Sequence, residues 1–307
     1  MPDRPLKLGT RASPLAMAQA HEARDRLCAA HPGLEVEIIP VTASGDKVLD
    51  RPLAEIGGKA LWTKELDAWL LAGEIDFAVH SLKDVETIRP IEIAIAAILP
   101  REDVRDVLVG ATSLAELPAG ARIGTSAPRR AAQALHARPD CRVVGIRGNV
   151  QTRLAKLQAG EADVTLLALA GLNRLGMAHF GTPLDPNAWL PAPGQGAIAI
   201  EARAADDRTR ALLSAIDDAP SHRAVIAERA LLAALGGNCH SPIAVLTQEQ
   251  GNSLTIRAAL LSPDGTERVE ETVTFAFDDL DGPARLAGEL LSKAGPAIRE
   301  HFDPPTR

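Results

Sequence analysis

Tyrosine is absent from the sequence, and aromatic residues make up only 3% of its 307 residues. Aromatic platforms on which nucleic-acid bases stack are therefore scarce, and the net charge of −7 also disfavours nucleic acid as the main partner. No stretch reaches the ~18 consecutive apolar residues of a membrane-spanning helix. The stretch "MPDRPLKLGT" leads directly into a predicted strand, with no apolar signal segment before it. We therefore expect a soluble cytoplasmic protein with no membrane partner.

Cysteine is nearly as rare, since the chain has only Cys28, Cys141 and Cys239. An odd and widely spaced set gives no disulfide framework and suits a reducing compartment. Lysine is scarce as well, with seven lysines against 26 arginines. A GC-rich genome alone explains such a bias. The alternative is that some arginines form forked contacts with carboxylates or phosphates.

What the sequence does contain is typical of a globular α/β protein. Hydrophobic residues make up 46% and charged residues 24%, and the length suffices for two or three domains. Residues 59–73 have helical apolar spacing that ends at Gly73. The predicted strands are 35–41, 91–98, 105–110 and 141–146. This alternation predicts sheets with helices on both faces, in which ligands bind at the carboxyl ends of the strands.

Two pairs of similar segments occur in the same order along the chain. Residues 6–20 ("LKLGTRASPLAMAQA") resemble residues 121–135 ("ARIGTSAPRRAAQAL"), each with a strand, Gly-Thr, a turn with proline and an alanine-rich helix. Residues 73–85 resemble residues 160–172, each with Gly-Glu-x-Asp before an apolar run of strand type. The shared order predicts two similar α/β modules rather than a tandem repeat, because the two offsets differ.

The second half of the chain changes character. Residues 181–196 are rich in proline and glycine and are interpreted as a linker. Residues 221–237 predict an amphipathic helix with Ser221 as its N-cap. The remaining predicted elements are strands at 196–203, 253–261 and 267–277 and a helix at about 280–293, the last three forming a small α+β unit.

The strand–Gly-Thr–turn–helix elements point backbone N–H groups at the space beyond the strand, which suits an anion. Arg11 and Ser13 lie in the first copy. The second copy holds Thr125, Ser126, Arg129 and Arg130. Serine and threonine often only cap helices, so capping is the alternative for Ser13 and Ser126. Arginines in both copies favour anion binding.

A predicted strand ends at His80 and is followed by three polar residues, Ser81, Lys83 and Asp84. A carboxylate beside an ammonium is usually a surface ion pair, but ligands of α/β folds bind at this end of a strand. Asp84 would remain ionised beside Lys83 and could stabilise a cation.

Further along, Arg147 follows another predicted strand, and Arg153 and Arg174 lie in predicted helices; each alone is more typical of a solvated arginine. The loop "IGGKALW" lacks the spacing of a Walker A motif, so nucleotide binding is unsupported.

Cys239 lies in a glycine-containing turn, "LGGNCHSPIA", directly before His240. A zinc site would need companion ligands at Cys-x-x-Cys spacing, which are absent. A Cys–His nucleophile pair would need a third, orienting group that the sequence does not identify. A small residue in a tight turn is the structural alternative, so the residues alone leave the role of Cys239 open.

A series of segments resembles the porphobilinogen deaminase (hydroxymethylbilane synthase) family, in order from the N-terminus to about residue 245. They are "GTRASPLA", "GDKVLDRPLAEIGGKALWTKEL", "DFAVHSLKDV", "REDVRDVLV", "IGTSAPRRAAQ", "IRGNVQTRLAKL", "LALAGLNRLG", "PAPGQGAIAIE" and "LGGNCHSPIA". The likeness covers roughly four fifths of the chain, and the last ~60 residues match only in general character.

The resemblance implies an α/β fold in which two domains like periplasmic binding proteins face a cleft, with a small C-terminal α+β domain. The implied domains are a discontinuous domain 1 (residues 1–99 and 197–217), domain 2 (104–193) and domain 3 (221–307). Domain 3 would carry the cofactor cysteine.

The resemblance also implies the chemistry. A dipyrromethane cofactor, self-assembled from porphobilinogen, would be bound to Cys239 through a thioether. On it a monomeric transferase of porphyrin and haem biosynthesis would join four porphobilinogen molecules, each losing ammonia, and release the linear tetrapyrrole hydroxymethylbilane. Each pyrrole carries an acetate and a propionate, which explains why an acidic protein would line one cleft with arginines.

The site residues are carried over from the family at matching positions, with no metal ligand among them. Asp84 would be catalytic, holding the pyrrole N–H groups and stabilising the cation formed as ammonia leaves. The expected cofactor-binding residues are Cys239, Ser13, Lys59, Ser81, Lys83, Asp84, Thr125, Ser126, Arg129, Arg130, Arg147 and Gly148. The expected substrate-binding residues are Arg11, Ser13, Arg147, Arg153, Arg174 and Gln195.

Three positions depart from the family pattern. Ala127 replaces a frequent serine, so one carboxylate contact is either missing or made by the backbone instead, and Trp62 replaces a phenylalanine. Asn238 replaces a common glycine before the cysteine, which leaves the geometry of that turn open.

Two other classes of protein stay open. A two-domain anion receptor would close on a solute without chemistry, but the placement of Cys239 and Asp84 disfavours it. A ligand-sensing regulator would need a DNA-binding element, and the sequence has no helix-turn-helix signal or basic face.

Overall fold

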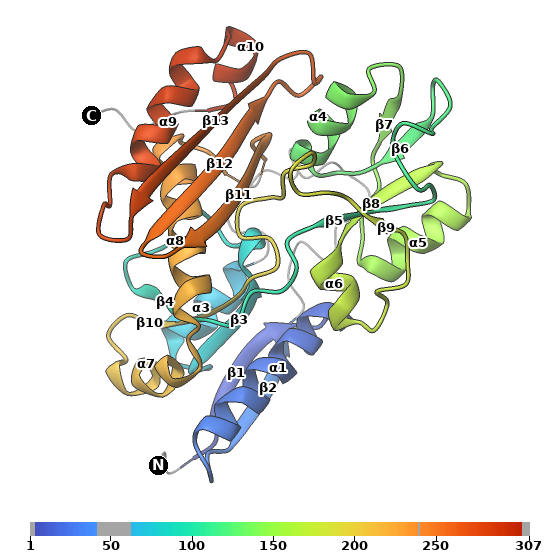
Figure 1. Ribbon diagram of the computed structural model, residues 1–307. Coiled ribbons are helices and arrows are strands. Elements are labelled where there is room, and N and C mark those ends of the chain that lie inside the picture. The colour runs from blue at the N-terminus through green and yellow to red at the C-terminus, as the bar shows by residue number, and fades with distance from the viewer. Residues whose placement is uncertain (1–3, 42–62, 239, 303–307) are drawn as a thin grey trace. The chain divides into compact units, whose positions relative to one another are not determined.

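The computed structural model describes residues 4–41, 63–238 and 240–302 (Figure 1). Lys59, Trp62 and Cys239, which the sequence singled out, lie outside the described residues. The described chain forms two compact units. Unit 1 holds residues 4–41, 63–102 and 196–222, and unit 2 holds residues 103–195, 223–238 and 240–302. The finer division into three domains stays a prediction.

Unit 1 is built on a five-stranded sheet of order β2-β1-β3-β10-β4. β1 pairs in parallel with β2 and β3, whereas β10 runs antiparallel between β3 and β4. The strands are β1 (Leu6–Arg11), β2 (Val36–Val41), β3 (Phe77–Ser81), β4 (Ile93–Ile98) and β10 (Ile198–Arg203).

Helices cover both faces of this sheet, as the sequence predicts. On one face Leu27 of α1 packs in a cluster with Phe77 and Ile200. On the other face Leu66 and Leu70 of α3 pack in a second cluster. The helical elements of unit 1 are α1 (Pro14–Ala30), α3 (Lys64–Ala72), η2 (Leu82–Asp84), α7 (Asp207–Leu213), η3 (Ser214–Ile216) and the start of α8 (Ala219–Ala234).

Unit 2 contains a second five-stranded sheet with the same plan, of order β7-β6-β8-β5-β9. β6 pairs in parallel with β7 and β8, and β5 runs antiparallel between β8 and β9. Its strands are β5 (Asp106–Val109), β6 (Arg122–Gly124), β7 (Arg142–Val144), β8 (Val164–Ala168) and β9 (Thr182–Pro183). Its helices are α4 (Pro128–Ala137), α5 (Val150–Gln158) and α6 (Leu169–Arg174).

The repeated segments therefore occupy equivalent strands, β1 with β6 and β3 with β8, which confirms the prediction of two similar α/β modules. The shared Gly-Thr has a packing reason. A Cβ on Gly9 would lie 2.4 Å from Cδ1 of Ile75, and a Cβ on Gly124 would lie 2.5 Å from Cδ1 of Ile146. Each module thus needs glycine where an isoleucine packs directly onto the strand backbone.

The rest of unit 2 is a three-stranded antiparallel sheet, β11 (Ile243–Gln250), β12 (Ser253–Leu261) and β13 (Arg268–Ala276). Its apolar face packs with α8, α9 (Gly282–Lys293) and α10 (Pro296–Arg299), burying Leu231, Ile256 and Leu290. The predicted strands and helix of this part are confirmed, and β11 was missed. The α/β class with a small α+β part is therefore confirmed.

Two local predictions are wrong. Helix α8 begins at Ala219, so Ser221 is not its N-cap; instead Oδ2 of Asp218 accepts a hydrogen bond from the Ser221 amide at 3.0 Å. Residues 181–196 are not a free linker, because they contribute β9 and bury Trp189 and Leu190. No helix of the described chain is long and apolar enough to cross a membrane.

Candidate active site

A pocket of about 50 Å³ lies in unit 1 where β1 and β3 end and α1 begins. Its lining comprises Arg11, Ser13, Leu15, Ala16, Gln19, Val79, His80, Ser81 and Asp84. The sequence placed four of these together, Arg11, Ser13, Ser81 and Asp84. They meet because β1 and β3 are parallel neighbours, so their carboxyl ends share one edge of the sheet.

The two serines of the pocket are held by α1. Ser13 is its N-cap, and its hydroxyl accepts a hydrogen bond from the Ala16 amide at 3.3 Å. The capping alternative is thus correct for Ser13, and the same side chain lines the pocket. Ser81 exchanges hydrogen bonds with the buried amide of Gln19, at 2.9 and 3.1 Å. Gln19 is a site residue that sequence reasoning missed.

Lys83 and Asp84 lie in η2, the single turn that follows β3 directly. Both are half-buried. The turn is fixed by its backbone, since the Leu82 amide donates to Ala197 O at 3.1 Å and the Val85 amide donates to Leu82 O at 3.0 Å. Asp84 therefore lines the pocket from a short, hydrogen-bonded turn.

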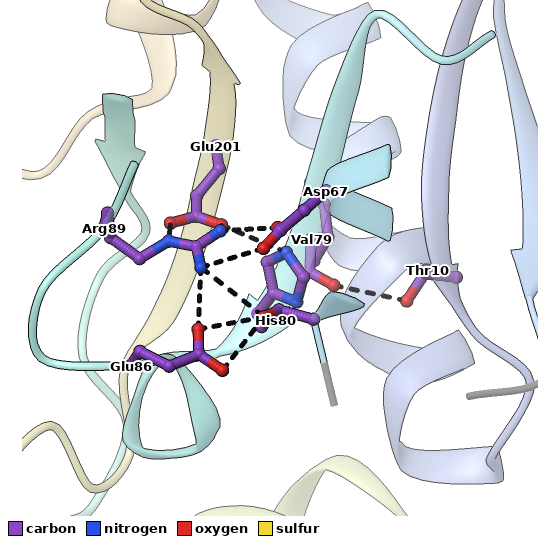
Figure 2. Close-up of polar contacts among 8 residues, drawn as sticks. Thr10, Asp67, Val79, His80, Glu86, Arg89 and Glu201 are labelled. Carbon is purple, nitrogen blue, oxygen red and sulfur yellow. Dashed lines mark hydrogen bonds and ion pairs between the residues drawn. The ribbon is translucent and has the colours of Figure 1, made fainter. Parts of the chain in front are cut away.

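Behind this turn Arg89 binds three carboxylates (Figure 2). A terminal nitrogen of Arg89 lies 2.6 Å from Asp67 and 2.8 Å from Glu201, and the other lies 2.7 Å from Glu86. The hydroxyl of Thr63 also donates to Glu86 at 2.9 Å. This group joins β10, α3 and the loop after η2.

Glu201 is the most buried member of the group, with no exposed surface. Its Oε2 lies 3.3 Å from Nε2 of His80, within ion-pair range but not aligned as a hydrogen bond. Burial alone would raise the pKa of Glu201, but the neighbouring His80 and Arg89 outweigh it and hold that pKa below its usual value of 4.5. Glu201 is therefore ionised at neutral pH.

In unit 2 a second group of predicted residues lies at the carboxyl ends of β6 and β7, which are parallel neighbours. The Ser126 hydroxyl donates to Ile146 O at 3.0 Å and so ties the two loops together. Nε of Arg153 donates to Gly148 O at 2.8 Å, ahead of the α5 N-cap. Gly148 has φ +116°, and a Cβ there would lie 2.6 Å from Thr152, so glycine is required.

Thr125 is buried, and its hydroxyl accepts a hydrogen bond from the Ala127 amide at 3.1 Å. It therefore caps the turn before α4, where Ala127 has no side chain to do so. Arg147 lies half-buried between β7 and α5, and Arg174 lies half-buried at the end of α6.

Arg129 and Arg130 are buried and are not exposed on the surface of unit 2. Asp106 on β5 lies 2.7 Å from a terminal nitrogen of each arginine. The same carboxylate accepts hydrogen bonds from Nε1 of Trp189 at 2.7 Å and from the Gln195 amide at 2.9 Å. Predicted contacts of Arg129, Arg130 and Gln195 with a ligand stay predictions. What the structure adds is the carboxylate that orients all three.

Burial would raise the pKa of Asp106, but the charges of Arg129 and Arg130 and the hydrogen bonds from Arg130 and Trp189 lower it below its usual 3.8. Sequence reasoning missed Asp106, Glu201 and Arg89. A signal existed for the first two, because each is a carboxylate inside an apolar strand, where a buried charge needs a cationic partner.

No three metal-ligating side chains gather in the described parts of the chain. What the pocket does gather is a guanidinium, two hydroxyls and a carboxylate. Such a set is chemically suited to a small molecule that carries both carboxylates and N–H donors.

Comparison with known proteins identifies the family. The model for "Porphobilinogen deaminase, dipyromethane cofactor binding domain" matches residues 6–211, and the model for "Porphobilinogen deaminase, C-terminal domain" matches residues 222–293. Porphobilinogen deaminase of Sphingopyxis alaskensis is 56% identical over 98% of both chains. That of Paracoccus denitrificans is 51% identical over 95% of this chain and 96% of the relative.

Among solved structures, a TRAP periplasmic solute binding protein from Desulfovibrio salexigens covers 70% of this chain and 73% of its own, at 11% identity and a TM-score of 0.43. The two family models together span most of the sequence, and the relatives match it nearly from end to end. The chain belongs to the porphobilinogen deaminase family.

Proposed function

We propose that this protein is a transferase of tetrapyrrole synthesis that joins four porphobilinogen molecules head to tail into hydroxymethylbilane. Each coupling would release ammonia. The proposal keeps the expectation of a monomer in the cytoplasm and of two domains that face a cleft.

The observation that carries the proposal is the pocket of unit 1. Porphobilinogen is a pyrrole with an acetate, a propionate and an aminomethyl group. Arg11 supplies a guanidinium for a carboxylate, and Ser13 and Ser81 supply hydroxyls beside it. Asp84 lines the same pocket and accepts hydrogen bonds, which suits the pyrrole N–H. The pocket thus offers partners both for the carboxylates and for the pyrrole N–H of the substrate.

The same donor set fits a dipyrromethane, whose rings carry the same acetate, propionate and N–H groups. Cys239 would hold it through a thioether, and the residues expected to bind it are Ser13, Lys59, Ser81, Lys83, Asp84, Thr125, Ser126, Arg129, Arg130, Arg147 and Gly148. When bound, the cofactor supplies a free pyrrole carbon to which the first substrate unit is joined. Tethering in this way makes each coupling effectively intramolecular.

Asp84 has the central role among the chain's own residues. Loss of ammonia builds positive charge on the substrate's pyrrole, and a fixed carboxylate stabilises that charge as it forms. The backbone hydrogen bonds of η2 hold Asp84 before the reaction, so little reorganisation is needed. Arg11, Arg147, Arg153, Arg174 and Gln195 would orient the carboxylates of substrate and product.

The test is single-turnover release of ammonia from porphobilinogen. Asp84→Asn keeps size and polarity but removes the charge, so we expect release to slow by ~10²–10³. Asp84→Glu should retain part of the rate. Asp25→Asn, an exposed change on α1, serves as the matched control and should behave as wild type. If the Asn variant stays within about tenfold of wild type, Asp84 is not the stabilising group.

The wild-type protein itself distinguishes an enzyme from a receptor that binds porphobilinogen without reaction. Purified enzyme that carries a covalent dipyrromethane turns pink with an Ehrlich-type reagent before any porphobilinogen is added, and an empty receptor does not. After porphobilinogen is added, the enzyme releases ammonia and a receptor releases none.

A further inference from the structure

We propose that Glu201 and Arg89 are positioning residues for Asp84. A single buried carboxylate on β10 ties together both ends of residues 80–89, the segment that carries Ser81, Lys83 and Asp84. This inference rests on the proposed function of Asp84.

The first tie is at the start of the segment. His80 is the next-to-last residue of β3, and its Nε2 lies 3.3 Å from Oε2 of Glu201. The β3–β10 register places His80 opposite Ala199 and Ser81 opposite Ile198. The entry to the turn is thus fixed by the ladder to β10, and the Glu201 carboxylate lies within ion-pair range of the His80 ring.

The second tie is at the end of the segment. Arg89 donates from Nε to Oε1 of Glu201 at 2.8 Å and from a terminal nitrogen to Oε2 at 2.8 Å. This is a two-pronged contact that fixes orientation as well as distance. Because His80 and Arg89 meet the same carboxylate (Figure 2), the segment closes into a loop whose ends cannot drift apart independently.

Arg89 also links the segment to α3 and to Glu86 in its own loop. Its terminal nitrogens donate to Asp67 at 2.6 and 3.1 Å and to Glu86 at 2.7 Å. The Arg89 side chain is only 8% exposed. Every nitrogen of the guanidinium is therefore used, and a lysine, which offers one point charge, cannot reproduce this geometry.

Between the two ties the Leu82 amide donates to Ala197 O and the Val85 amide donates to Leu82 O, on either side of Asp84. Ser81 is also hydrogen-bonded to Gln19, and Glu86 accepts a hydrogen bond from Thr63. Asp84 itself is half-buried at the pocket. Loosening Arg89 should leave the sheet intact and displace the turn, and a displacement of ~1 Å can slow a reaction by ~10².

The test compares Arg89→Lys with Arg203→Lys in the purified, cofactor-loaded protein. Arg203 is a matched control because it lies two residues beyond Glu201 on β10 and also forks, to Leu70 O, Ile75 O and Asp206. None of these three partners belongs to residues 80–89. Two quantities are measured, namely single-turnover ammonia release at saturating porphobilinogen and amide hydrogen exchange of peptides that cover residues 80–89.

We expect Arg89→Lys to slow release about ten- to a hundredfold and to speed exchange in residues 80–89. Arg203→Lys should change neither, even if it lowers the melting temperature. A release rate within about twofold of the control, or unchanged exchange in the segment, overturns the proposal. If Arg89→Lys does not fold, Glu201→Gln is judged by the same two criteria.

Asp84→Asn separates this inference from the proposed function. If Asp84 is catalytic, the Asn variant is slow, and adding Arg89→Lys to it should slow release little further, because the positioned group is already gone. If Asp84→Asn alone is nearly normal, the proposed function fails. If Asp84→Asn is slow while Arg89→Lys matches its control, only the positioning role fails.

Discussion

The carboxylate of Asp106 lies 2.7 Å from a terminal nitrogen of Arg130, and both side chains are buried. Arg129 meets the other oxygen of the same carboxylate at 2.7 Å. One anion thus compensates two cations inside unit 2, and its loss would leave both uncompensated. The first prediction follows from this imbalance.

Asp106→Asn should destabilise the protein by about 3–5 kcal/mol, the usual cost of breaking a buried ion pair on one side. The amide keeps an acceptor for Trp189 but no charge for the arginines. Urea unfolding measures the change. Asp163→Asn, which breaks the exposed pair with Arg122, is the control and should shift the midpoint little. A midpoint for Asp106→Asn equal to the control's would contradict the prediction.

Low pH should lower the free energy of unfolding through the carboxylates of Asp106 and Glu201. The pKa of Asp106 and that of Glu201 are lowered in the folded protein from 3.8 and 4.5. Their stabilisation is present above those values and is lost as pH falls below them, because the unfolded chain then binds protons that the folded chain does not. We expect the unfolding free energy to fall between about pH 5 and pH 3. Each such group contributes up to about 1.4 kcal/mol per pH unit.

The measurement is urea unfolding at a series of pH values for wild type and Asp106→Asn. The variant should show a shallower slope at the acid end, since one of the contributing groups no longer titrates. Parallel slopes would mean that the pKa of Asp106 is not lowered by folding.

The arginines of unit 2 should separate into two kinds. Arg147→Leu should weaken binding about ten- to a hundredfold, the loss of a charge-assisted pair, with little change in unfolding. Arg130→Lys should mainly lower stability, because a lysine cannot keep both the Asp106 contact and the hydrogen bond to Leu166 O. Isothermal titration calorimetry measures the change in binding, and urea unfolding measures the change in stability. Unchanged turnover and cofactor assembly in Arg147→Leu would make Arg147 a solvated bystander.

Cys239→Ser should yield folded protein with no covalent cofactor and almost no activity. Intact mass measures the attachment directly. Cys28→Ser on α1 and Cys141→Ser in the unit 2 core are the controls, and both should keep the added mass. A wild-type mass equal to that of the bare chain would refute the assignment.

Much of the fold was predictable because its signals are local. Apolar strands, the Gly-Thr turns and Gly73 at the end of α3 mark elements through residues close in sequence. The repeated segments even indicated the two similar sheets. Ser221 failed as an N-cap because Asp218, three residues earlier, does the same capping with its carboxylate.

The candidate site was predictable only in part, for a physical reason. Motifs name residues at strand ends, such as Asp84, but not which distant charges orient them. Glu201 meets Arg89 across 112 residues of sequence, and Asp106 meets Trp189 across 83. No local pattern encodes such pairings. A buried carboxylate in the sequence indicates that a cationic partner is needed, but it does not indicate which residue supplies it.

The placement of β10 has a consequence for how the protein is made. β10 lies between β3 and β4 in unit 1, yet the ribosome delivers it only after all five strands of the other sheet. The nascent chain up to residue 102 therefore lacks the strand that joins β3 to β4 in its own sheet, and contacts this distant in sequence form slowly. We expect that a fragment ending there would not fold, and that the turn holding Asp84 takes shape only late in synthesis.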